Sequence, residues 1–335
     1  MDTDILQRLT AATTDAEREA IVLEMSLAAL SADVQAAVQA AAIPHWFDSR
    51  YLEALLGEGS DALYAELLTL NFVEQLPGKG YAIHERTRRQ LLHNLWQDKP
   101  ERFRTLSGRA ADYCDAQASQ TDEPEWQAEA IYHRLISDPN VGVAGLRGLA
   151  TKWANYEYHT YDEIERALRW ANEQLAAGRL TGSGADWTRL WQAKLALIYG
   201  RPHLATPPLT QITPDPSSDP YLAAELAQTR GDIFAQTEDR AGMETAWRTA
   251  YDLYRQLADG QGELDAYLVA EKMGQHGLAD PEGTAEAETR PKTTPSRHAL
   301  QLIDNISAAW IEGVLNTALD KTIDLRMNRS ATQPS

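Results

Sequence analysis

Apolar residues recur every three or four positions along most of the chain, and this spacing predicts amphipathic helices. Residues 1–42 are expected to be helical, with Ser31 as the N-cap of an alanine-rich helix. The apolar period changes to two over residues 72–76 and 81–84, which predicts two strands joined by a turn at 77–80. The pattern therefore predicts a mainly α protein with one small β-hairpin.

The stretch 43–97 has the order of elements found in a winged-helix unit. Pro44 interrupts the preceding helix, and Asp48 and Ser60 are expected to cap two short helices. The hairpin follows these helices, and a longer helix begins at Glu85. Helix, helix, strand, turn and strand in this order predict a winged-helix-like domain, followed by one more helix.

Beyond this domain the pattern predicts an α-helical repeat array. Residues 98–200 contain helical stripes separated by Gly or Pro, which is typical of stacked helical hairpins. The prolines of 201–220 predict an extended linker. In 221–276 small residues such as Gly231 on one helix precede Trp247 on the next, a spacing that resembles a tetratricopeptide (TPR) repeat with a capping helix.

The C-terminal part of the sequence divides into two segments. Residues 277–297 are rich in Gly, Glu, Thr and Pro, a composition typical of a disordered linker. Residues 298–327 return to helical spacing and predict a tethered amphipathic helix. Its apolar face needs a partner, so Trp310, Ile311 and Val314 are candidate partner-binding residues, for another protein or for self-association.

Composition indicates a soluble cytoplasmic protein. The formal net charge is −18, and this field opposes approach to nucleic acids and to anionic membranes. The single cysteine, Cys114, excludes an internal disulfide framework and fits a reducing compartment. The sequence shows neither a signal peptide nor an apolar run long enough to span a membrane.

Because winged helices often bind DNA, that function has to be weighed. The helix before the first strand would enter the major groove, where reading bases needs Arg, Lys, Asn or Gln. Residues 60–70 include Asp61 and Glu66 and no basic residue. We therefore expect a winged helix that contacts protein. The alternative is a transcriptional regulator whose winged helix binds DNA and whose TPR-like region binds an effector.

The segment Ala-Ile-Pro-His-Trp-Phe-Asp at 42–48 and the hairpin at 72–85 resemble a known family. They are similar to the winged-helix-plus-repeat portion of bacterial signal-transduction ATPases of the NACHT and NB-ARC type. In that family a Met-His-Asp motif ends the second wing strand, and its histidine approaches the phosphates of bound ADP. Ile83-His84-Glu85 has the similar place here, so the resemblance implies His84 as a candidate nucleotide contact, although Ile and Glu replace Met and Asp.

The sequence contains no motif for catalysis. It lacks a phosphate-binding loop of the form Gly-x-x-x-x-Gly-Lys-Ser/Thr. It also lacks His and Cys residues at the spacing of metal ligands, and a nucleophile elbow. We therefore expect no catalytic residue, no metal and no cofactor, and His84 is expected to cap or pack at the start of its helix. These observations predict a non-enzymatic interaction scaffold, adaptor or sensor of a bacterial signalling or defence ATPase system. Its ATPase domain would be lost or would lie on another chain.

A basic group in this acidic chain is a candidate interaction surface. Arg86, Arg89 and His93 are spaced to share one face of the helix that begins at Glu85. This face either is solvated and forms ion pairs with the repeats, or it docks an acidic partner or a phosphate.

An aromatic group gives a second candidate surface. Trp153, Tyr156 and Tyr158 lie within six residues of one another. Such a cluster either fills the space between helices or lines a groove that binds a peptide.

Overall fold

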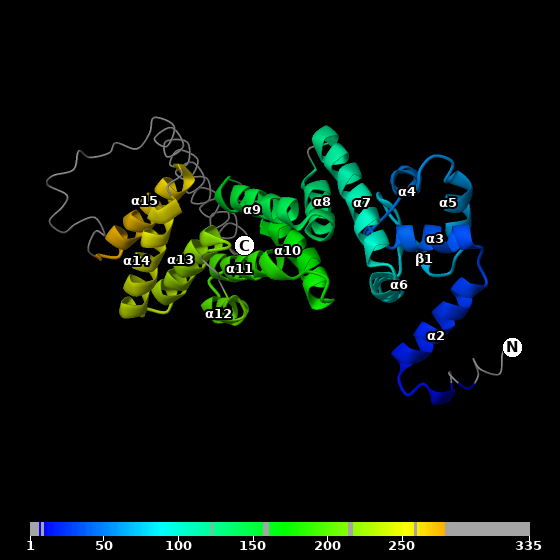
Figure 1. The fold of residues 1–335 in the computed structure, drawn as a ribbon, viewed down its shortest axis with the longest axis horizontal. Helices are drawn as coiled ribbons and strands as arrows, with labels where there is room; N and C mark the ends of the chain where they lie inside the picture. Colours follow the sequence, from blue (N-terminus) through cyan, green and yellow to red (C-terminus); the bar gives the residue numbers. More distant parts are fainter. Residues whose placement is uncertain are drawn as a thin grey trace, which may run out of the picture. The chain divides into compact units, whose positions relative to one another are not determined.

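The computed structural model describes residues 7, 10–121, 123–156, 161–213, 217–257 and 260–278. The described chain is mainly helical and has one small antiparallel sheet, so the predicted fold class is confirmed at this level (Figure 1). Within these residues, no helix has both the length and the apolar character that crossing a membrane requires.

The chain divides into two compact units. Unit 1 comprises Met1–Gly142 together with Trp170–Leu180, and unit 2 comprises Val143–Arg169 together with Thr181–Ser335. The elements that lie wholly in unit 1 are α2 (Asp15–Ala28), α3 (Ala32–Ala41), α4 (Ser49–Leu56), α5 (Asp61–Leu67), β1 (Val73–Leu76), β2 (Gly80–Ile83), α6 (Glu85–Asp98), α7 (Pro100–Thr121) and α8 (Pro124–Ser137).

Side chains cap most of the short helices of unit 1. Ser31 accepts a hydrogen bond from the backbone N of Val34 at 3.3 Å, and Asp48 accepts one from Tyr51 at 2.7 Å, as the sequence predicts. The predicted cap at Ser60 is wrong. Ser60 precedes α5, but its backbone is already helical and its side chain makes no capping hydrogen bond. A cap residue needs an extended backbone to bring its oxygen over the first turn.

The hairpin also pairs with the segment that precedes α4. β1 and β2 run antiparallel with Leu76 opposite Gly80. Phe47 forms a bridge to Tyr81, and the two N–O distances are 2.7 and 2.9 Å. Gly80 has φ 104°, and a Cβ there would lie 2.6 Å from the Phe47 carbonyl oxygen. Only glycine therefore allows this close approach of the two backbones.

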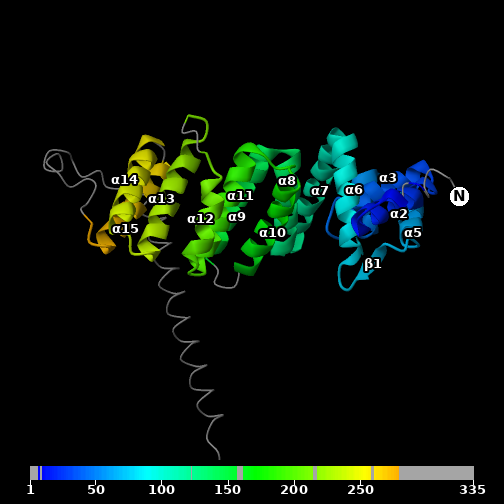
Figure 2. The same cartoon turned by 90° about the horizontal axis from the view of Figure 1, so that it is seen from below.

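Unit 2 is built from antiparallel helices. Their bounds are α11 (Gly182–Ile198), α12 (Pro202–Thr210), α13 (Pro220–Gln236), α14 (Arg240–Leu257) and α15 (Gly260–Gln275), and α9 (Pro139–Tyr156) and α10 (Tyr161–Ala176) belong to both units. α11 packs on α12, while α13, α14 and α15 lie side by side (Figure 2).

A glycine lets α13 and α14 approach closely. A Cβ on Gly231 would lie 2.2 Å from Cδ1 of Trp247, so the indole occupies the space that a side chain on α13 would fill. Trp247 is 1% exposed, and its indole N–H donates to Asp232 at 3.0 Å. The small residues thus lie at the contact and the large ring fills the gap, the distribution that the sequence predicts for this pair.

The prediction of an extended linker at 201–220 is wrong in its first half, because α12 forms there. Pro202 occupies the first turn, where a missing N–H costs nothing. Pro207 and Pro208 lie inside the helix, but Ala205 and Leu209 are buried and α12 packs on α11. Apolar burial against α11 offsets the two missing hydrogen bonds. The predicted tail from residue 279 onward lies outside the described residues.

Candidate functional site

Unit 1 contains a buried carboxylate at the centre of a polar cluster. Glu129 of α8 is fully buried. Its oxygens accept hydrogen bonds from the backbone N of His45 at 3.0 Å and from Nδ1 of the same residue at 2.7 Å, and they lie 3.2 Å from Nε2 of His133. Burial alone would raise the pKa of Glu129, but the charge of His45 and these hydrogen bonds outweigh it and lower that pKa below 4.5. The carboxylate is therefore ionised and fully paired.

His45 connects two acidic residues that lie far apart in sequence. Its Nδ1 is 2.7 Å from Glu129 and its Nε2 is 3.3 Å from Glu173 of α10. Its ring stacks on Trp170, with centroids 4.3 Å apart. A neutral imidazole has one N–H and would turn a lone pair toward one of the carboxylates, whereas the imidazolium donates at both nitrogens. Both ring nitrogens of His45 therefore face carboxylate oxygens.

Arg88 of α6 is the cation of the same cluster. Only 5% of its surface is exposed, and it donates to the three main-chain carbonyls of 42–44 at 3.0–3.2 Å. Two further bonds reach the Tyr132 hydroxyl at 2.9 Å and Glu173 at 3.2 Å. Burial opposes its charge, but Tyr132 and Glu173 outweigh that effect and raise the pKa of Arg88. All three nitrogens of the guanidinium are thus used.

We call these residues the buried ionic cluster: His45, Arg88, Glu129, His133 and Glu173. The cluster joins the segment before α4, the helix after the hairpin, α8 and the end of α10. The sequence pattern singled out the segment at 42–48 only as a motif. On α6 it indicated the exposed arginines, and not Arg88, as candidate interaction residues. The helical period places Arg88 with Leu91, Leu92 and Leu95 on the buried face of α6, and this was the available signal.

The lone cysteine lies beside the cluster but is not a reactive thiol. Its sulfur is 3.0 Å from the Tyr51 hydroxyl, which lies 3.3 Å from Nε2 of His133. Burial raises the pKa of the Cys114 thiol well above 9.0, so the nucleophilic thiolate does not form at neutral pH. Nor does the described part of the chain contain a group of three or more His, Cys, Asp or Glu side chains arranged to hold a metal ion.

Unit 1 should lose stability as the pH falls below about 6.5. Burial lowers the pKa of His133 below 6.5, and the pKa values of Glu129 and Glu173 are lowered below 4.5. The unfolded chain therefore binds more protons in acid than the folded chain does. The stability from these groups is present above their ordinary pKa values and is lost as the pH falls. Hydrogen exchange of α8 amides between pH 7 and pH 4 measures this loss once intrinsic exchange rates are removed.

The buried carboxylate provides the control. At pH 4 the carboxyl of Glu129 is protonated in most unfolded chains, since its ordinary pKa is 4.5, so we expect it to contribute a loss of about 0.8 kcal/mol between pH 7 and pH 4. In Glu129→Gln the loss that Glu129 contributes near and below pH 4.5 should disappear, while the loss from Glu173 remains. An unchanged pH profile in this variant would contradict the assignment of the loss to Glu129.

His84 does not have the predicted capping role. It precedes α6 as the N-cap residue, but its side chain makes no capping hydrogen bond. The ring is exposed, and its Nε2 lies 3.4 Å from Glu74 on the facing strand. The backbone N of His84 donates to Phe72 at 2.9 Å and so continues the hairpin. Its contact with a nucleotide stays a prediction.

The basic residues of α6 lie on one exposed face, as predicted. Arg86 pairs with Glu19 of α2, and Arg89 pairs with Glu85 at 3.1 Å. His93 is exposed on the same helix. The expectation that these ion pairs reach the repeats is wrong for both arginines, because their carboxylate partners belong to α2 and to the start of α6. Docking of an acidic partner stays a prediction.

The remaining predicted site residues fall where the structure gives no side-chain positions. Trp153 and Tyr156 belong to α9, but their side chains are outside the described part. The other members lie outside the described residues altogether: Tyr158, Trp310, Ile311 and Val314. The peptide groove and the partner-binding tail therefore stay predictions.

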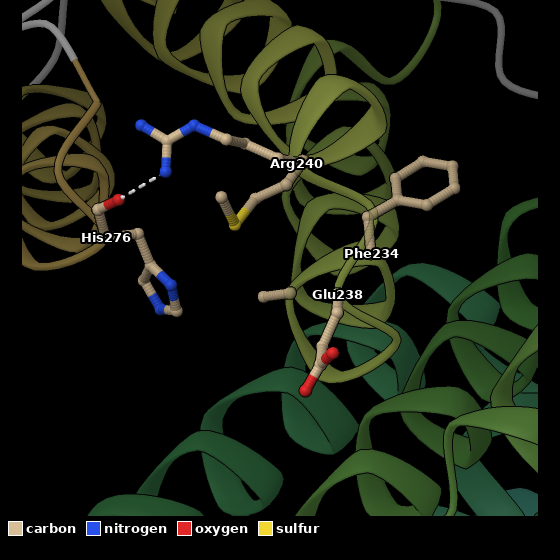
Figure 3. A pocket seen from close by; sticks show the side chains of 6 residues that line it. Phe234, Glu238, Arg240 and His276 are labelled. Carbon is tan, nitrogen blue, oxygen red and sulfur yellow. Dashed lines mark hydrogen bonds between the residues drawn. The ribbon is translucent and has the colours of Figure 1, made fainter.

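Unit 2 has a shallow pocket of about 200 Å³ beside α13, α14 and α15 (Figure 3). Arg240 at its edge donates to the main-chain carbonyls of His276 at 3.2 Å and Gly277 at 2.8 Å. These carbonyls end α15 and lack partners within the helix, so the arginine stabilises the helix terminus. The cation is therefore engaged within the chain, and the other charged side chain of the lining is the carboxylate of Glu238. It is lined by Phe234, Ala235, Glu238, Arg240, Met243 and His276.

Fold and site together define a mainly α-helical protein in which a small hairpin-containing part is joined to further helices by buried charges. No protein-family model, curated protein or solved structure matches the chain. The function therefore has to be inferred from the surfaces and contacts of the residues themselves.

Proposed function

We propose that this protein is a non-enzymatic interaction scaffold, built from a winged-helix-like domain and TPR-like helical pairs. It would serve as the adaptor or sensor of a bacterial signalling or defence ATPase system. One observation carries the proposal: the two elements that a winged helix normally turns toward DNA present no free cation among the described residues.

The order of elements in unit 1 supports the winged-helix assignment. α3 is followed by the bridge at Phe47, then by α4, α5, β1 and β2. The isolated bridge lies where a winged helix has its short first strand, since Phe47 pairs with Tyr81 of the hairpin through two hydrogen bonds. A winged helix has the same sequence of helix, short strand, two helices and a two-stranded wing.

α5 occupies the place of a recognition helix. Its exposed positions are Asp61, Ala62, Ala65 and Glu66. Base edges in the major groove are read by Arg, Lys, Asn and Gln, and phosphates are contacted by cations. An acidic helix would instead repel the duplex, so this face suits a protein partner.

The turn of the hairpin corresponds to the wing. Its cation, Lys79, pairs with Glu125 of α8 and lies 4.6 Å from the centre of the Trp46 ring. Releasing it to a phosphate would break both contacts. The wing therefore stabilises unit 1 itself.

The helical pairs of unit 2 support the scaffold part of the proposal. Gly231 and Trp247 pack α13 against α14 in the manner of a TPR repeat, and α15 packs on α14 as the next helix. Stacked pairs of this kind present extended surfaces that bind other proteins.

DNA binding is the decisive test. We expect no change in the fluorescence anisotropy of labelled random or promoter duplexes near 150 mM salt, because neither α5 nor the hairpin turn offers the phosphates a free cation that would release counterions. Asp61→Arg/Glu66→Arg provides a matched gain-of-charge control and should bind with a steep salt dependence. Salt-sensitive binding by the natural chain near 150 mM would favour the transcriptional-regulator alternative.

Partner capture tests the scaffold directly. The natural chain, crosslinked in its source cells and purified under denaturing conditions, should carry a specific protein that mass spectrometry identifies. Nucleotide turnover by the purified chain alone would contradict the non-enzymatic proposal.

A further inference from the structure

An arginine of unit 2 lies in a corner formed by two aromatic rings. The guanidinium carbon of Arg147, on α9, is 4.3 Å from the ring centre of Trp187 on α11 and also 4.3 Å from that of Tyr221 on α13. The two ring centres are 6.5 Å apart. If the two rings lay on opposite faces of the guanidinium, their centres would be 8.6 Å apart, which is twice 4.3 Å. The rings therefore flank the guanidinium on two adjacent sides and leave its other edges uncovered.

Hydrogen bonds hold both rings in place. The indole N–H of Trp187 donates to Asp219 at 2.9 Å, and the hydroxyl of Tyr221 donates to Asp265 of α15. Trp187 is only 1% exposed. Because four elements fix the corner, Arg147 is held in position before any ligand arrives, and little conformational entropy is left to lose on binding.

The N–H groups of Arg147 have no acceptor within the described chain. Its contacts there are with the two rings. Among the described residues, none of its nitrogens is buried without a hydrogen-bond partner. Neighbouring arginines of unit 2 differ, since Arg189 pairs with Asp186 at 3.1 Å and Arg248 with Glu244 at 3.2 Å.

We infer that Arg147 binds a carboxylate carried by a peptide segment of the partner, an inference that rests on the proposed scaffold function. A stacked guanidinium with a free fork of N–H donors matches the two oxygens of a carboxylate. Asp219 and Asp265 accept hydrogen bonds from the two rings, and the chain carries a net charge of −18, so a dianionic phosphate is repelled more strongly than a monoanion. The ring edges can contact the apolar stem next to the carboxylate.

The carboxylate could belong to an acidic side chain or to a chain end, and the test separates the two. The full chain, labelled with ¹⁵N-arginine, is titrated with three amino-acid derivatives and with inorganic phosphate, while the Arg147 Nε–Hε signal is followed by NMR. N-acetylglutamate α-amide offers a side-chain carboxylate, N-acetylglutamine a main-chain carboxylate, and N-acetylglutamine amide neither. We expect a saturable shift with at least one carboxylate and none with the neutral amide.

Variants identify the signal and test the geometry. Arg147→Lys keeps the charge and loses the fork, and Arg147→Gln loses both. We expect at least about tenfold weaker carboxylate binding in either variant, with unchanged thermal unfolding. Equal responses to the acid and the neutral amide, stronger binding of phosphate, or unchanged binding in Arg147→Gln would each overturn the inference.

A readout with the partner distinguishes this inference from the proposed function. If crosslinking captures a protein equally with the natural chain and with Arg147→Gln, the scaffold function stands and the role of Arg147 fails. If no protein is captured while the carboxylate shift is present, the proposed function fails and the site stands.

Discussion

Replacing Glu129 with alanine should destabilise unit 1 by about 3–5 kcal/mol, the cost of breaking a buried ion pair by removing one partner. The variant leaves Nδ1 of His45 and Nε2 of His133 without the carboxylate that lies 2.7 and 3.2 Å away. His45 then keeps only one carboxylate neighbour of the two, Glu173, at 3.3 Å from its Nε2. Hydrogen exchange of α8 and α6 amides reports the opening of unit 1 directly.

A matched control lies at the start of the same helix. Glu123 precedes α8, is exposed and makes no capping hydrogen bond, so Glu123→Ala should change stability by no more than about 0.5 kcal/mol. Glu129→Gln keeps the volume and an acceptor oxygen but removes the charge, and its effect should fall between the two. A cost below about 1 kcal/mol for Glu129→Ala would show that water replaces the carboxylate, against the full burial of this site.

Gly142→Ala should destabilise the contact between α8 and α9 by about 3 kcal/mol, at the upper end for overpacking. A Cβ at Gly142 would lie 2.4 Å from the backbone N of Leu135 and 2.6 Å from its Cα. These atoms belong to α8 and cannot rotate away as a side chain can, so the two helices have to separate. Urea unfolding followed by circular dichroism, together with exchange of α8 amides, measures the effect.

Gly148 of the same helix provides the opposite case. No atom lies within 4 Å of a Cβ placed there, and the residue is exposed. Gly148→Ala should therefore stabilise α9 by about 0.5–1 kcal/mol, because alanine loses less backbone entropy on forming a helix. If both substitutions changed the free energy of unfolding in the same direction and by the same amount, helix propensity rather than the α8–α9 contact would explain the effect of Gly142→Ala.

Candidate site residues could be predicted from the sequence only where the residue type and its helical position together indicated an exposed charge. The arginines of α6 stood out as charges on a polar face, and the structure places Arg86 and Arg89 there, paired with Glu19 and Glu85. Arg147 could not be singled out, because its two aromatic neighbours come from helices about 40 and 74 positions away (187 − 147 and 221 − 147). Contacts over such separations leave no periodic signal in the sequence.

The sequence by itself determined the local structure of this protein. The caps at Ser31 and Asp48, the glycine turn before Gly80 and the helical periods of the described residues depend on neighbours within a few positions, and the structure contains these features. Only the tertiary structure decided that Arg88, His45 and Glu129 meet, and that 202–210 forms α12 despite its prolines. The physical reason is burial: whether a charge must be paired, or a proline tolerated, depends on which distant segment removes it from water.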